Sequence, residues 1–180
     1  MSDRERVPEV FSADYTGTAG SRTFYLQTKD EQGTFSYLVE KQQVALLAEK
    51  LRELLVAVDA ADSVLAAEPE RDPGLAIADP GEPQWRVGAM GLAYQPDDDR
   101  VLVFMTPVGE EQDEVAPPEE AEDLEAFELR LSLRRDQARS FALHAAAVLA
   151  EGRPICQLCG LPMDPEGHLC PASNGHRKMS

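Results

Sequence analysis

The residues best suited to chemistry in this chain are cysteines and histidines near its C-terminal end. All three cysteines (Cys156, Cys159 and Cys170) and two of the three histidines (His168 and His176) lie in one short segment. Structural zinc sites surround the ion with four thiolate or imidazole donors. The clustering therefore predicts one structural zinc ion per chain, bound by this segment.

The spacing of the cysteines predicts how the segment folds around the ion. Two residues separate Cys156 from Cys159, and Gly160 follows. This pattern is typical of a zinc knuckle, in which a tight turn brings both sulfurs to one metal. The turn-forming residues 164–167 then predict a small hairpin that returns Cys170 to the knuckle.

The fourth ligand has two candidates. His168 lies two residues before Cys170, on the same face of the expected strand. His176 follows Cys170 after a loop that contains Asn174 and Gly175, and it completes a second group of ligands facing the first. We favour His176 for this reason. His168 is then an alternative ligand or a hydrogen-bonding neighbour of the ligands.

Other uses of these cysteines fit the sequence less well. A disulfide between Cys156 and Cys159 would leave Cys170 unpaired, and nothing else in the sequence indicates secretion. A redox Cys-x-x-Cys pair usually begins a helix, whereas this pair follows an expected helix and precedes a turn. A structural zinc site is favoured over a catalytic one, because the nearby Asp164 and Glu166 are turn residues rather than placed general bases.

The rest of the chain alternates strands and helices. Six strands are expected at residues 10–15, 23–28, 34–39, 85–94, 100–106 and 126–133. One amphipathic helix opens at residues 40–43, carries Leu65 on its apolar face and ends at Pro69. A second helix runs from about residue 136 to Gly152.

These elements predict the α+β class, with an antiparallel sheet of about six strands and two helices on one face. We expect an α+β domain over residues 8–152, with exposed loops at 68–83 and 109–123, and a zinc-binding tail over 153–180. The order strand, strand, strand, helix occurs twice, and the two strand-to-helix junctions resemble each other in sequence. An internal duplication is therefore one hypothesis. The alternative is that the resemblance only reflects the sequence pattern found wherever a strand leads into an amphipathic helix.

Arginines form a second group of chemically interesting residues. Those in or beside the expected strands are Arg22, Arg86, Arg100, Arg130, Arg134 and Arg135. Such a group can mark a site for an anion or a protein. Pairing with the many carboxylates of the chain is the simpler interpretation, and we favour it.

Charge and hydrophobicity argue against several classes of function. The net charge of −16 opposes binding to nucleic acid or to anionic membranes, and no basic patch that would override it is evident. No apolar run approaches the ~18 residues that span a bilayer, and the first residues lack the apolar core of a signal peptide. We therefore expect a cytoplasmic protein, in a compartment where thiols stay reduced and available to metal.

Three stretches carry a family resemblance: residues 37–43, residues 85–100, and the tail from Arg153 to Arg177. They resemble an uncharacterised actinobacterial family catalogued as domain of unknown function 3090, over the full length of the chain. The resemblance implies no activity, because none is established for the family.

Two classes of function fit these observations. The leading hypothesis is a non-enzymatic binding or adaptor protein, with a structural zinc tail and a protein partner. The alternative is an enzyme, with either an open zinc site or an arginine-lined pocket on the sheet; no familiar catalytic motif supports it. Binding of nucleic acid through the tail is the weakest interpretation, given the charge of the chain.

Overall fold

A computed structural model describes residues 5–77, 79–109, 127–152, 156–160, 163, 168 and 170–172. The strands are β1 Glu5–Arg6, β2 Val10–Thr16, β3 Thr23–Asp30, β4 Gly33–Val39, β5 Val87–Gln95, β6 Arg100–Pro107 and β7 Leu129–Arg134. The helices are α1 Lys41–Val58 and α2 Arg135–Ala150, with a short 3₁₀ helix, η1, at Pro73–Leu75. The α+β class is confirmed.

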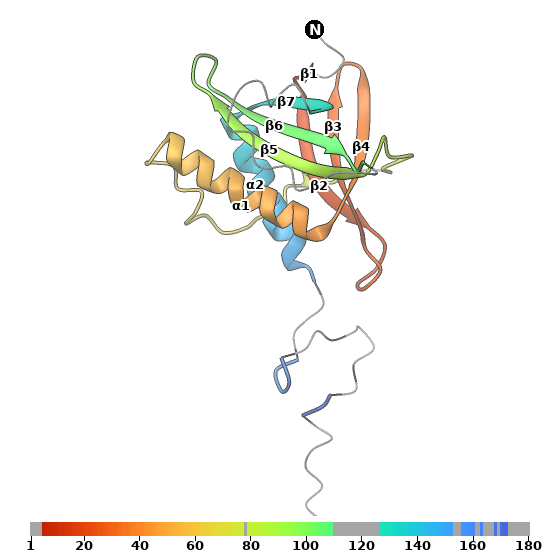
Figure 1. The fold of residues 1–180 in the computed structure, drawn as a ribbon. Coiled ribbons are helices and arrows are strands. Elements are labelled where there is room, and N and C mark those ends of the chain that lie inside the picture. Colours follow the sequence, from red (N-terminus) through yellow and green to blue (C-terminus); the bar gives the residue numbers. More distant parts are fainter. Residues whose placement is uncertain are drawn as a thin grey trace, which may run out of the picture.

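The described strands form two sheets, where the sequence predicted one. The first sheet has the order β2-β3-β4 and is antiparallel throughout; the second has the order β1-β7-β6-β5, with β1 parallel to β7. A single sheet would pair β4 with β5, but among the described residues one parallel bridge, between Leu38 and Arg86, links this part of the chain to β4. Both helices lie on the same side of the strands (Figure 1).

The core lies between the strands and the helices. The buried residues of α1 recur every three or four positions at Val44, Leu47, Ala48, Leu51 and Leu55, as a helix covering a sheet requires. The helices pack on each other, and α2 also packs on β2, where the rings of Phe11 and Phe141 stack at 4.4 Å.

Helix α1 ends earlier than its apolar periodicity predicted. The helix stops at Val58 rather than at Pro69. The carboxylates of Asp59 and Asp62 accept hydrogen bonds from the backbone N–H groups two residues further on, which gives the chain an alternative to helical hydrogen bonding. As a result Val64 is fully buried, whereas Leu65, expected on the apolar face, is 56 % exposed.

Residues 68–77 and 79–83 form a mostly exposed connection that contains η1. The second expected loop, residues 109–123, lies outside the described residues apart from Gly109. The boundary between domain and tail remains a prediction.

The two halves of the chain make equivalent contacts with each other. The third residue of each helix is a glutamine, and its side-chain amide donates to two backbone carbonyls at the start of the other half. Gln43 bonds to Val87 (3.2 Å) and Gly88 (2.8 Å), and Gln137 bonds to Pro8 and Glu9 (both 2.9 Å). The halves β2-β3-β4-α1 and β5-β6-β7-α2 are thus related by an internal pseudo-symmetry.

Strand pairing follows the same symmetry. Strand β1, which precedes the first half, pairs in parallel with β7, the last strand of the second half. Arg86, which precedes the second half, bridges in parallel to Leu38 in β4, the last strand of the first half. This reciprocity supports the duplication hypothesis with contacts between residues far apart in sequence.

Candidate functional site

Four potential metal ligands come together near the C-terminal end of the chain. One donor atom from each of Cys156, Cys159, His168 and Cys170 lies within 4.8 Å of the other three. None of the three cysteines forms a disulfide. Cys156 and Cys170 are buried, whereas Cys159 and His168 are partly exposed.

Two of the separations between these donors are close to the edges of a tetrahedral zinc site. With Zn–S bonds of about 2.3 Å and Zn–N bonds of about 2.0 Å, a tetrahedron has edges of about 3.8 Å between two sulfurs and about 3.5 Å between sulfur and nitrogen. The sulfurs of Cys156 and Cys170 are 3.8 Å apart, and Cys159 Sγ lies 3.7 Å from His168 Nε2. A disulfide would need about 2.05 Å between sulfurs. The donor set could therefore hold a metal ion, and zinc suits its chemistry and these two separations.

The local backbone shapes the knuckle as the spacing predicted. Gly160 has φ +72°, a left-handed conformation that glycine adopts without steric cost, and its N–H donates to the carbonyl of Cys156 at 2.8 Å. Hydrogen bonds from the backbone N–H groups of Leu158 and Cys159, and one from His168, lower the pKa of Cys156 to about 6. Cys156 is therefore largely thiolate at neutral pH, which is the metal-binding form.

Four of the five predicted ligands are thus found together. The favoured fourth ligand, His176, lies outside the described residues, as does the predicted turn at 164–167. His168, the alternative, is the histidine that the structure places among the sulfurs. The preference for His176 stays a prediction.

The fold and this site define the class of the protein. It is an α+β protein in which three cysteines and one histidine cluster as potential metal ligands. Within that class, the chain belongs to the family described as protein of unknown function (DUF3090), whose model matches residues 5–170. The match includes all four clustered residues and ends before His176. No curated protein and no solved structure matches the chain. Neither described helix combines the length and apolar character needed to cross a bilayer.

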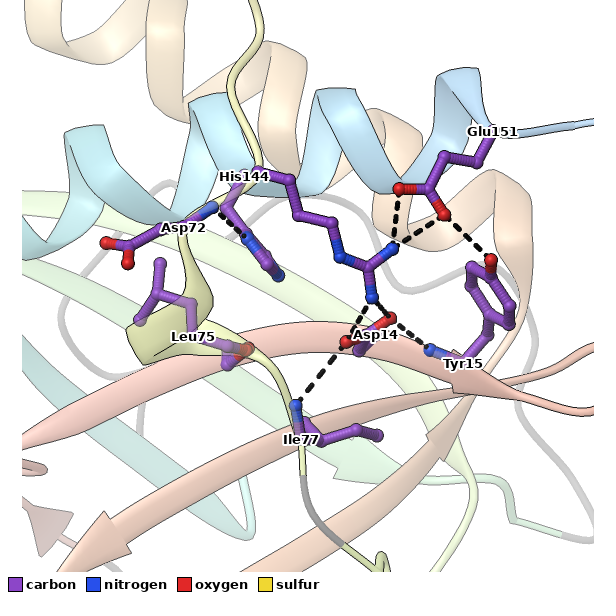
Figure 2. Close-up of polar contacts among 9 residues, drawn as sticks. Asp14, Tyr15, Asp72, Leu75, Ile77, His144 and Glu151 are labelled. Carbon is purple, nitrogen blue, oxygen red and sulfur yellow. Dashed lines mark hydrogen bonds and ion pairs between the residues drawn. The ribbon is translucent and has the colours of Figure 1, made fainter.

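Sequence reasoning missed a second polar cluster, which joins the 68–83 connection to β2 and α2. Figure 2 shows Asp14, Tyr15 and Glu151 in this cluster. Arg71 donates to both carboxylate oxygens of Asp14 at 2.8 Å and to Glu151 at 2.6 Å, and Tyr15 donates to Glu151 at 2.7 Å. Hydrogen bonding to Arg71 lowers the pKa of Glu151, and Asp14 is almost fully buried. The cluster fixes an otherwise exposed connection to the core.

His144 belongs to the same region and is fully buried. Its Nδ1 accepts a hydrogen bond from the backbone N–H of Asp72 at 3.0 Å (Figure 2). Burial lowers the pKa of His144, so its imidazole is neutral at physiological pH. No sequence pattern assigned His144 a role, because Arg71 and Asp72 lie in a proline-rich connection with no periodicity to place them.

The arginines near the strands are mostly paired with carboxylates, as the simpler interpretation held. Arg86 pairs with Glu40, Arg134 with Asp136, Arg135 with Asp99 and Asp59, and Arg130 with Glu5 at a longer 3.8 Å. Arg22 instead lies over the ring of Tyr15, 3.9 Å from its centroid.

Proposed function

We propose that this chain is a zinc-binding protein that holds one structural zinc ion through Cys156, Cys159, Cys170 and His168. The observation that carries the proposal is the mutual approach of four donor atoms to within 4.8 Å. Four protein ligands complete a tetrahedral shell, which is the arrangement of structural rather than catalytic zinc. The ion would hold the knuckle and Cys170 in one folded unit.

Zinc content of the untagged full chain, purified without added metal, tests the site. We expect one zinc per chain, and a tetrahedral cobalt(II) spectrum, unchanged by added anions, after substitution. The variant Cys156→Ser/Cys159→Ser should lose the metal. A chain that carries no zinc and cannot be loaded with cobalt would contradict the proposal.

The identity of the fourth ligand has its own test. His168→Ala should lower zinc affinity at least tenfold in a competition with a chromophoric chelator, because a three-ligand site remains. His176→Ala is the matched control and should leave the affinity unchanged. The reverse result would assign the ligand to His176.

We further propose that the chain acts in the cytoplasm as a non-enzymatic binding or adaptor protein, and that a protein partner recognises the metal-folded tail. The closed ligand shell supports this role, because it leaves no position on the ion for a substrate. Crosslinking in cells should capture a partner with the native chain but not with Cys156→Ser/Cys159→Ser. Capture that does not depend on the cysteines would place recognition elsewhere, and absence of any captured partner would contradict the adaptor role.

A further inference from the structure

A cleft of about 610 Å³ opens where the start of β3 meets the junction of β4 and α1. This volume lies within the range of small-molecule sites. The buried ring of Phe24 and the side chain of Leu38 contribute apolar walls, and Gly152, just beyond the end of α2, lines the cleft as well.

The charge of the cleft is opposite to that of the chain. Arg22, Lys41 and Arg86 line it together with one carboxylate, that of Glu40, which leaves an excess of two positive charges. The chain as a whole carries −16. A local reversal of this size attracts a small anion against the overall field.

Two of the three cations form no ion pair within the described part of the chain. The guanidinium of Arg22 lies over the ring of Tyr15, and its charge contributes to lowering the pKa of Glu151, but it forms no ion pair with that carboxylate. Lys41 forms no ion pair within the described part of the chain, although it is the first residue of α1, where the helix dipole disfavours a cation. An anion bound in the cleft would give both cations an ion-pair partner.

The pseudo-symmetric counterpart of this region shows what such cations bind elsewhere in the same fold. Arg135, the first residue of α2, corresponds to Lys41. Its guanidinium lies 2.8 Å from Asp99, the residue just before β6, and 3.7 Å from Asp59, the C-cap of α1. The cation of the second half is thus neutralised by two carboxylates, one from each half.

The first half has neither of these neutralising contacts. The residue just before β3 is Arg22 rather than an aspartate. The C-cap of α2 is Glu151, whose carboxylate is held by Arg71 and Tyr15. Where Arg135 contacts two carboxylates of the chain, its counterpart Lys41 lines an open, positively charged cleft.

We infer that this cleft binds a phosphate-bearing small molecule, with the phosphate between Arg22 and Lys41 and the organic part against Phe24 and Leu38. A phosphate monoester carries about −1.5 to −2 charges at pH 7, which matches the excess charge of the cleft. This site is independent of the zinc tail and of the adaptor role.

Phenyl phosphate, titrated into the full-length ¹⁵N-labelled chain and followed by NMR, tests the inference. Backbone amide signals of Lys41 and Gly152 should shift in a saturable manner, and benzyl alcohol, the uncharged probe, should not shift them. Inorganic phosphate should compete, which separates recognition of phosphate from recognition of the ring.

Variants connect the binding to the cleft. Arg22→Gln and Lys41→Gln should each weaken phenyl phosphate binding about tenfold, the loss expected for a charge-assisted hydrogen bond. Arg22→Asp, which copies the Asp99 position of the second half, should abolish binding.

Arg134→Gln is the matched control, because Arg134 is an exposed arginine paired with Asp136 outside the cleft, and this variant should bind as the native chain does. Absence of binding, shifts confined to other surfaces, or equal affinity in all variants would overturn the inference.

Discussion

At the scale of single residues, His144 gives the molecule a defined response to acid. Its imidazole is excluded from water, and the positive charge of Arg71 further opposes protonation, while Asp14 and Asp72 favour it. Burial is the largest of these effects and lowers the pKa of His144 in the folded chain. In the unfolded chain the same group titrates near its ordinary value of about 6.5.

The sign of the pH effect follows from this difference. Above about pH 7.5 His144 is neutral in both states and contributes no pH dependence. As the pH falls through about 6.5, the unfolded chain binds a proton at His144 and the folded chain does not. The free energy of unfolding therefore falls by up to about 1.4 kcal/mol per pH unit. This decline ends once His144 is protonated in the folded chain as well.

The variant His144→Gln keeps an acceptor for Asp72 but cannot titrate. Denaturant unfolding of both chains between pH 7.5 and pH 5.5 should therefore give a shallower decline of stability for the variant. The tail histidines are common to both chains and cancel in the comparison. Equal slopes would mean that His144 is protonated equally easily in both states.

Gly160 is the other residue whose environment makes a sharp prediction. Its φ of +72° costs a side-chain-bearing residue about 1 kcal/mol, so Gly160→Ala should lower zinc affinity about fivefold in chelator competition. Gly81→Ala is the matched control, because Gly81 has a similar φ of +59° and an equally open surrounding but lies in the 68–83 connection. A loss of affinity in both variants would show that the effect is not local to the knuckle.

At the scale of elements, the hydrophobic pattern of the sequence predicted strands and helices correctly wherever its periodicity is regular. The six expected strands and both helices exist, since alternation and 3.6-residue spacing reflect which face is buried. Pattern failed where side chains compete with backbone hydrogen bonding. The aspartates after Val58 end α1 about ten residues before Pro69, and Arg71 fixes a connection whose composition indicated only an exposed loop.

The two equivalent glutamines make a prediction at this same scale. Gln137→Leu removes the donor for two backbone carbonyls at a buried site and should cost about 1–3 kcal/mol of unfolding free energy in urea. Gln43→Leu, at a less buried site, should cost less. The exposed neighbour Gln42 serves as control, and Gln42→Leu should stay within about 0.5 kcal/mol of the native chain. Equal stability of all three variants would mean that the glutamine contacts contribute nothing net.

At the scale of the whole molecule, the features that sequence reasoning could not reach are those that join distant segments. The cysteine cluster was predictable because its ligands are close in sequence and their spacing encodes a turn. The division into two sheets, the parallel pairing of β1 with β7 and the basic cleft all depend on how the halves meet. The local periodicity of hydrophobic residues carries no information about such contacts.

The reciprocal contacts between the halves have a consequence for how the protein can be divided. Each half leaves the backbone carbonyls at its own beginning to be bound by a glutamine of the other. A chain cut within the exposed 68–83 connection should therefore yield two fragments that are unfolded when alone and regain the native circular dichroism spectrum when mixed. Such a pair would work as a split reporter, in which assembly of the fold registers that two fused proteins have come together.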